Sequence, residues 1–84
     1  MPKLKPSDTE LKRRMAQGVI DGAMSRQGLD NETLAIKLHV SDRTVRGRRK
    51  LPDNFRLDQL WKLADVMKLR DRDILELFGR DPDA

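Results

Sequence analysis

The sequence predicts an all-α protein, a compact bundle of five short helices. Apolar residues recur at spacings of three and four along most of the 84 residues. Residues that cap helices, together with Gly and Pro residues that end them, divide this pattern into five segments. No segment alternates apolar and polar residues as a strand would.

Length and composition limit the possible classes. A chain of 84 residues with 37% hydrophobic residues forms one domain with one modest core. The absence of cysteine excludes disulfides and thiolate metal sites. No run approaches the roughly 20 apolar residues of a membrane span, and no secretory signal is recognisable. We therefore expect a soluble cytoplasmic protein without a membrane partner.

The first helix is expected to follow a flexible arm over residues 1–7, which holds two prolines and two lysines. Ser7 or Asp8 can cap this helix. Gly18 and Gly22 lie four residues apart inside it and are expected to permit close helix packing. Its apolar face comprises Leu11, Met15, Val19, Ile20, Ala23 and Met24.

The second and third helices form a corner. Gly28 suits the left-handed residue that ends the first helix, and Asp30 can cap the second, "NETLAIKL". Ser41 can cap the third, "DRTVRGRRK", only about three residues further on. The residues expected to face inward here are Leu34, Ala35, Leu38 and Val45.

The last two helices follow Pro52, which disfavours helical geometry at Leu51. A fourth helix is defined by Leu57, Leu60, Leu63, Ala64 and Met67. The fifth begins at Asp71 or Asp73, has Ile74, Leu75 and Phe78 as its apolar residues, and ends at Gly79. Residues 79–84 form a polar tail, so the folded domain is expected to span residues 8–78.

Charge is distributed unevenly around a net value of +4. Residues 37–50 hold six basic residues and one acid, a local balance of +5, whereas residues 71–84 hold five acids and two arginines, a balance of −3. This asymmetry favours an oriented face that binds a polyanion. The alternative is an ordinary solvated charged surface.

The stretch from Leu29 to Lys50, followed by "LDQLWKLADVMKL", resembles the Cro/C1-type, lambda repressor-like helix-turn-helix family. The matching residues are Leu34–Ala35, Val40–Ser41, Val45, and downstream Leu60, Leu63 and Ala64. The resemblance covers about residues 8–78 and implies a helix-turn-helix motif at about residues 31–50. It implies a sequence-specific transcriptional regulator of double-stranded DNA, of phage or mobile-element repressor type.

The expected recognition helix spans residues 41–50 and lies in the major groove. Outward-pointing positions after the cap give four predicted base-reading residues, Asp42, Arg43, Arg46 and Gly47. Arginine can donate two parallel bonds to guanine, and aspartate can accept from cytosine N4. Gly47 can permit close approach to the bases, or it can simply weaken the helix end.

Residues flanking this face are predicted to bind phosphates: Asn31, Lys37, Ser41, Thr44, Arg48, Arg49, Lys50 and Arg56. One module of this size reads only a few base pairs, so we expect a homodimer at least on DNA. Candidate dimer contacts are Leu77 and Phe78 and the edge near Trp61.

The chain departs from the family at the turn, where His39 replaces the usual Gly, and at Arg48–Arg49, where an aromatic residue and Glu are common. Leu51 replaces the usual terminating Gly. His39 has no partners at metal-ligand spacing, so no metal is predicted.

Trp61 is expected to be partly buried core, with a dimer contact or a platform for Arg48 as the alternatives. No catalytic arrangement or phosphate-binding loop is recognisable, so an enzyme and a cofactor are not expected. A DNA-binding antitoxin with a toxin partner, or a helical protein-interaction adaptor, are the alternative functions.

Overall fold

The computed structural model describes residues 7–83, so most of the predicted arm and Ala84 of the predicted tail lie outside the described residues. Within this range the chain forms five α-helices and one 3₁₀ helix, and no strand. The elements are α1 (Asp8–Gln27), α2 (Asn31–Leu38), α3 (Asp42–Lys50), η1 (Pro52–Asn54), α4 (Leu57–Val66) and α5 (Asp71–Leu77). The all-α prediction is confirmed, but α1, at 20 residues, is not short.

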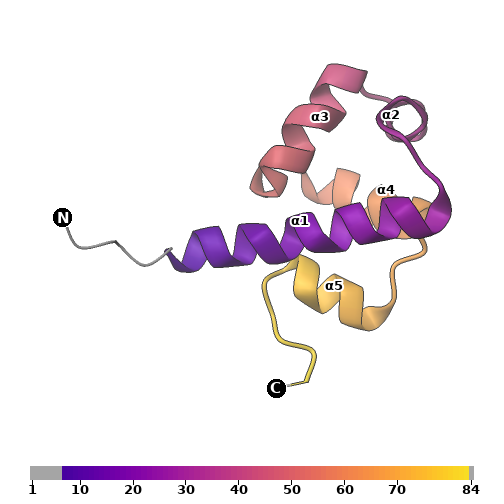
Figure 1. Ribbon diagram of the computed structural model, residues 1–84. Helices are drawn as coiled ribbons and strands as arrows, with labels where there is room; N and C mark the ends of the chain where they lie inside the picture. The colour runs from indigo at the N-terminus through magenta and orange to yellow at the C-terminus, as the bar shows by residue number, and fades with distance from the viewer. Residues whose placement is uncertain (1–6, 84) are drawn as a thin grey trace.

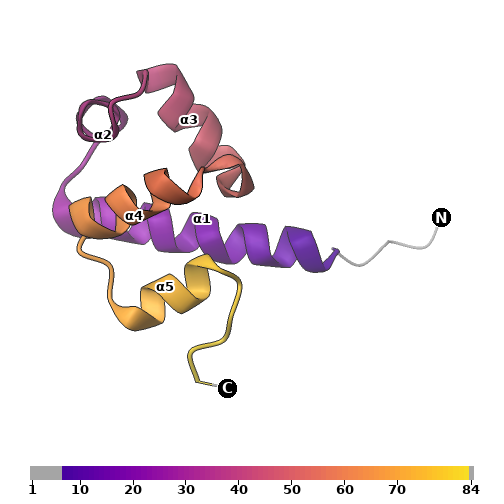
Figure 2. The same cartoon turned by 180° about the vertical axis from the view of Figure 1, so that it is seen from behind.

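Helix α1 runs along the whole molecule (Figure 1). Helices α2 and α3 lie on one side of it and α5 on the other, and the view from behind shows α4 in front of α1 (Figure 2). Helix α1 packs against α3 and α5, while α2 packs against α3 and α4. The pair α2–α3 therefore stands on the opposite side of α1 from α5.

The helix boundaries follow the predicted caps. The hydroxyls of Ser7 and Ser41 and the carboxylate of Asp30 each accept a hydrogen bond from the backbone N–H three residues later, at 3.1, 3.0 and 2.7 Å. Gly28 and His39 end α1 and α2 in the left-handed region, with φ of 64° and 58°. Histidine thus takes the conformation that usually favours glycine.

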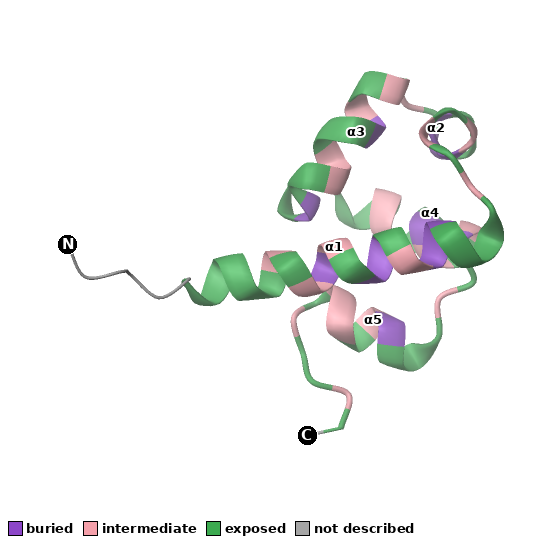
Figure 3. Cartoon of the chain, viewed as in Figure 1, coloured by how far each residue is buried: buried purple, intermediate pink, exposed green. Residues whose placement is uncertain are grey.

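The core forms where α1, α2, α3 and α4 meet. Its largest fully buried side chains are Ile20, Leu34, Val45, Leu63 and Met67. Buried residues follow the inner side of each helix, and the outer sides are exposed (Figure 3). The core therefore joins the α2–α3 corner directly to α1 and α4.

Several apolar residues that define the predicted helical patterns are exposed. They are Leu11, Leu57, Leu75 and Phe78. Trp61, predicted to be partly buried, is 63% exposed. Helical spacing identified the apolar positions but not which of them a neighbouring helix would cover.

The prediction for Gly18 and Gly22 is also wrong. A Cβ atom at Gly18 would meet no heavy atom within 4 Å, and one at Gly22 would meet only the end of Arg26 at 3.8 Å. None of the described helices approaches α1 closely at these positions, so close packing does not explain the two glycines.

Helix α5 is attached to α1 through a buried carboxylate. Asp73 is 5% exposed and accepts hydrogen bonds from the backbone N–H of Arg70 at 3.0 Å and from its guanidinium at 3.0 and 3.2 Å. Arg26 of α1 adds a longer bond of 3.4 Å. The hydrogen bonds from the Arg70 side chain lower the pKa of Asp73, against the opposing effect of burial.

We expect this carboxylate to make stability depend on pH. Because the pKa of Asp73 is lower in the folded protein, its contribution is fully present above the unfolded value of about 3.9 and is lost as pH falls through the folded value. Asp73→Asn should lower the free energy of unfolding by about 1–2 kcal/mol at pH 7. Urea unfolding from pH 7 to 2 should show this difference shrinking toward low pH. A difference that stays constant with pH would contradict the prediction.

Candidate nucleic-acid interface

Helix α3 is held on the corner by its one buried residue and by its cap. Val45 is completely buried in the core and is the only buried residue of α3. At the turn, the N–H of Val40 donates to the carbonyl of Ala35 at 3.0 Å, and Ala35 is itself buried between the helices. Because His39 adopts a left-handed conformation, the chain turns sharply, and only three residues separate the end of α2 from the start of α3. The sequence thus fixes both where α3 starts and which side faces inward.

The side of α3 opposite Val45 carries the exposed residues Arg43, Arg46, Gly47 and Lys50, which we call the outer stripe. The residues beside this stripe, Asp42, Thr44, Arg48 and Arg49, are half-buried. Three positive charges and a glycine therefore form the outermost surface of the corner. Exposed cations on a single helix are suited to a polyanion.

Three of the four predicted base-reading residues belong to the outer stripe. The fourth, Asp42, lies at its edge and forms an ion pair with Arg46 one turn away. Arg43 and Lys50 form no ion pair with any residue between Ser7 and Asp83. Arg43 is thus the predicted reader with the least internal competition.

The predicted phosphate ligands fall into different environments. Lys37 is exposed on the last turn of α2. Arg56 precedes α4 and pairs with Asp58 at 3.2 Å. The hydroxyls of Ser41 and Thr44 are hydrogen-bonded to each other at 2.8 Å within the cap. These residues therefore come from the last turn of α2, the start of α3 and the residue before α4.

Arg48 and Arg49 point away from the outer stripe. Within the described part of the chain, the buried Nε of Arg48 has no hydrogen-bond partner. The guanidinium of Arg49 donates to the side-chain oxygens of Asn31 and Asp21, both at 2.7 Å. Two predicted phosphate ligands, Arg49 and Asn31, are therefore bonded to each other.

Two residues of α1 at this site were missed by sequence reasoning. Gln17 donates from Nε2 to the carbonyl oxygen of Lys50 at 2.7 Å, and Asp21 binds Arg49. They lie four residues apart beside the buried Ile20, which is a weak sign of a contact at the edge of the core. Their partners are 33 and 28 residues along the chain, so no local pattern could identify them.

No family model, curated protein or solved structure matches the chain. Among residues 7–83 no His, Cys, Asp and Glu side chains gather into a group that could bind a metal ion. None of the described helices has the length and apolar character needed to cross a membrane.

Gly47 offers a test of the outer stripe in the free protein. A Cβ atom there would meet no heavy atom of the described residues within 4 Å. Gly47→Ala should therefore raise the free energy of unfolding by about 0.5–1 kcal/mol through helix propensity alone. Gly28→Ala is the matched control. Its Cβ would also be in open space, but φ of 64° should make that substitution destabilising. Urea unfolding of both variants would show the opposite signs, and a destabilised Gly47→Ala would mean that the helix is not regular there.

Proposed function

We propose that the protein is a sequence-specific regulator that binds double-stranded DNA through a lambda repressor-like helix-turn-helix. In this proposal α2 and α3 form the motif, and α3 enters the major groove. The observation that carries it is the outer stripe, whose three exposed cations surround a glycine on a helix fixed by the buried Val45. An α-helix of this width fits the major groove.

Base reading is assigned to the N-terminal half of α3. Arg43 is free to make two parallel hydrogen bonds to O6 and N7 of a guanine. Arg46 must exchange its ion pair with Asp42 for a base, which releases the carboxylate to accept from cytosine N4. Gly47 allows the backbone of α3 to approach the base edges, because no Cβ projects from it.

Phosphate binding is assigned to cations around the stripe and to the start of α2. If each protomer neutralises about four phosphates, log K should fall against log salt with a slope near −3.6 per protomer.

We expect selection from a random duplex pool to yield one preferred sequence. Titrations of that duplex and of a scrambled duplex with the same base composition, over a salt series, test the proposal. A slope near zero on both duplexes would rule it out.

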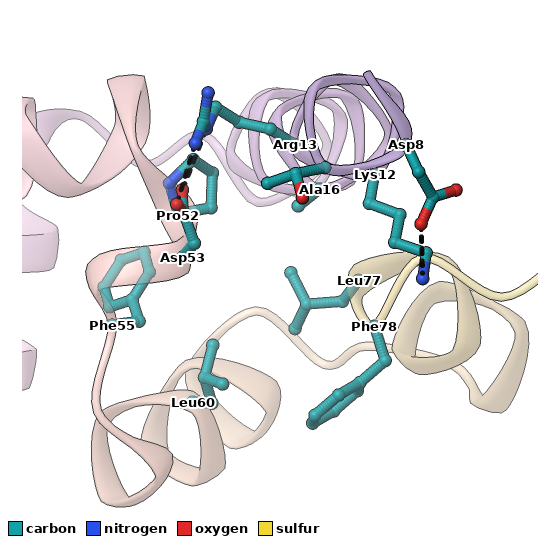
Figure 4. A pocket seen from close by; sticks show the side chains of 11 residues that line it. Asp8, Lys12, Arg13, Ala16, Pro52, Asp53, Phe55, Leu60, Leu77 and Phe78 are labelled. Carbon is teal, nitrogen blue, oxygen red and sulfur yellow. Dashed lines mark hydrogen bonds and ion pairs between the residues drawn. The ribbon is translucent and has the colours of Figure 1, made fainter.

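A homodimer on DNA is part of the proposal. Exposed apolar side chains, including Trp61 and Phe78, lie on α4 and just after α5. Leu60, Leu77 and Phe78 line an open hollow of about 330 Å³ between α1, α4 and the end of α5 (Figure 4). We expect two such surfaces to pair and to place half-sites about 34 Å apart. Footprinting that finds one isolated half-site saturated by one protomer would contradict the dimer.

The same exposed apolar residues favour one alternative, in which a protein partner such as a toxin covers them instead of a second copy. Trp61 and Leu57 lie one turn apart on α4, and both are more than half exposed. In that case the purified protein should stay monomeric on its selected duplex, and a stable partner should co-purify with it. Sedimentation of the DNA complex separates this alternative from the homodimer.

A further inference from the structure

Arg49 joins three helices at the C-terminal end of α3. Its Nη1 donates to Oδ1 of Asn31 at the start of α2, and its Nη2 donates to Oδ1 of Asp21 on α1, both at 2.7 Å. The Arg49 side chain is only 30% exposed. One turn before Asp21, Gln17 donates to the carbonyl oxygen of Lys50 at 2.7 Å. Two neighbouring turns of α1 thus hold the end of the proposed recognition helix.

These contacts matter because α3 packs mainly on α2, and none of its residues 46–50 is buried. Val45 is its only buried side chain, so contacts beyond it, at the C-terminal end, help to set the angle of the helix. Arg49 lies about 6 Å along the axis from Val45, at about 1.5 Å per residue. A tilt of about 10° would move the helix there by roughly 1 Å, more than the about 0.5 Å within which a binding site must be held.

We infer that Arg49 is a positioning residue, which with Asp21 and Asn31 sets the angle of α3, and is not a phosphate ligand. This inference rests on the proposed function and changes the role of Arg49 and Asn31 within it. The carboxylate of Asp21 balances the charge of Arg49, and two of its N–H donors are already used. A phosphate ligand would instead need these donors free, as they are in Arg43.

Asp21→Asn gives the sharpest test, because the two roles predict opposite signs. The substitution removes a negative charge beside α3, so electrostatics alone would strengthen binding to every duplex. If Asp21 positions α3, affinity for the selected duplex should instead fall by about tenfold, while affinity for the scrambled duplex stays equal or rises. Asp21→Glu keeps the charge and should retain most of the preference. If Asp21→Asn raised the affinity for both duplexes equally, the inference would be overturned.

Arg49→Gln and Lys50→Gln form a matched pair, each removing one positive charge from the end of α3. Lys50→Gln should lower the affinity for both duplexes and make the slope of log K against log salt shallower by about 0.9. Arg49→Gln should lower mainly the affinity for the selected duplex and leave the salt slope unchanged. If Arg49→Gln changed the slope as Lys50→Gln does, Arg49 would be a phosphate ligand and the inference would be wrong.

A measurement without DNA separates this inference from the proposed function. In the free protein, Asp21→Asn should shift the backbone amide NMR signals of residues 46–50 on α3. Shifts confined to α1 within one turn of the substitution would overturn the positioning role, whether or not DNA is bound. If wild-type protein selects no sequence but the α3 signals move, the positioning contact stands and the proposed function fails.

Discussion

Arg43→Ala should weaken binding to the selected duplex by about 1–3 kcal/mol and remove the preference at one base position. Arg43 is exposed on the outer stripe, in the first turn of α3, and has no ion pair with a residue in the range 7–83. No internal bond has to break before it reaches a guanine. The loss should therefore appear on duplexes that carry the preferred base and vanish when that base is changed.

Arg14→Ala is the control for the loss of one positive charge. Arg14 is also exposed, but it lies on α1 beside a hollow that α1 shares with α5, away from α3. We expect it to change the affinity for either duplex little at 0.15 M salt, where exposed charges more than about 8 Å apart are largely screened. If Arg43→Ala lowered the affinity for the selected and the scrambled duplex by the same factor, Arg43 would bind phosphate and not a base.

Leu34→Ala should have the largest effect on stability, lowering the free energy of unfolding by about 2–5 kcal/mol. Leu34 is fully buried where α2 packs on α3 and α4, so the substitution leaves a cavity beneath the corner. A domain of this size has a total stability of only about 4–13 kcal/mol, at roughly 0.05–0.15 kcal/mol per residue. Urea unfolding followed by circular dichroism would measure the loss.

Ile36→Ala on the same helix is its control. Ile36 lies two residues further along α2 and is 71% exposed, so its truncation should change the free energy of unfolding by less than about 0.5 kcal/mol. Similar losses in the two variants would mean that α2 presents a different side to the core.

The fold could be predicted largely because its boundaries are local. Ser41 caps α3 through the N–H three residues later, and His39 takes a left-handed conformation, both of which depend on neighbouring residues. Val45 could be assigned to the core because it lies on one side of a short helix whose other side is charged. The outward positions of α3, which we propose to read bases, follow from the same helical geometry.

The contacts between distant segments could not be predicted in this way. Arg49 looks like any other cation of α3 in the sequence, and only the packing of α1 places Asp21 beside it. Trp61 has the helical spacing of a core residue, but within residues 7–83 no helix covers that part of α4, and Trp61 is exposed. Sequence periodicity indicates which side of a helix is apolar, whereas tertiary packing decides which partner each residue meets.

Methylation interference on the selected duplex tests the central claim most directly, that the outer stripe of α3 reads base edges in the major groove. Methylation of guanine N7 blocks a major-groove acceptor, whereas methylation of adenine N3 blocks the minor groove. We predict that N7 methylation of guanines in each half-site prevents binding, and that Arg43→Ala makes one of these guanines insensitive. Interference only at adenine N3, or an N7 pattern that Arg43→Ala and Arg46→Ala both leave unchanged, would contradict the claim.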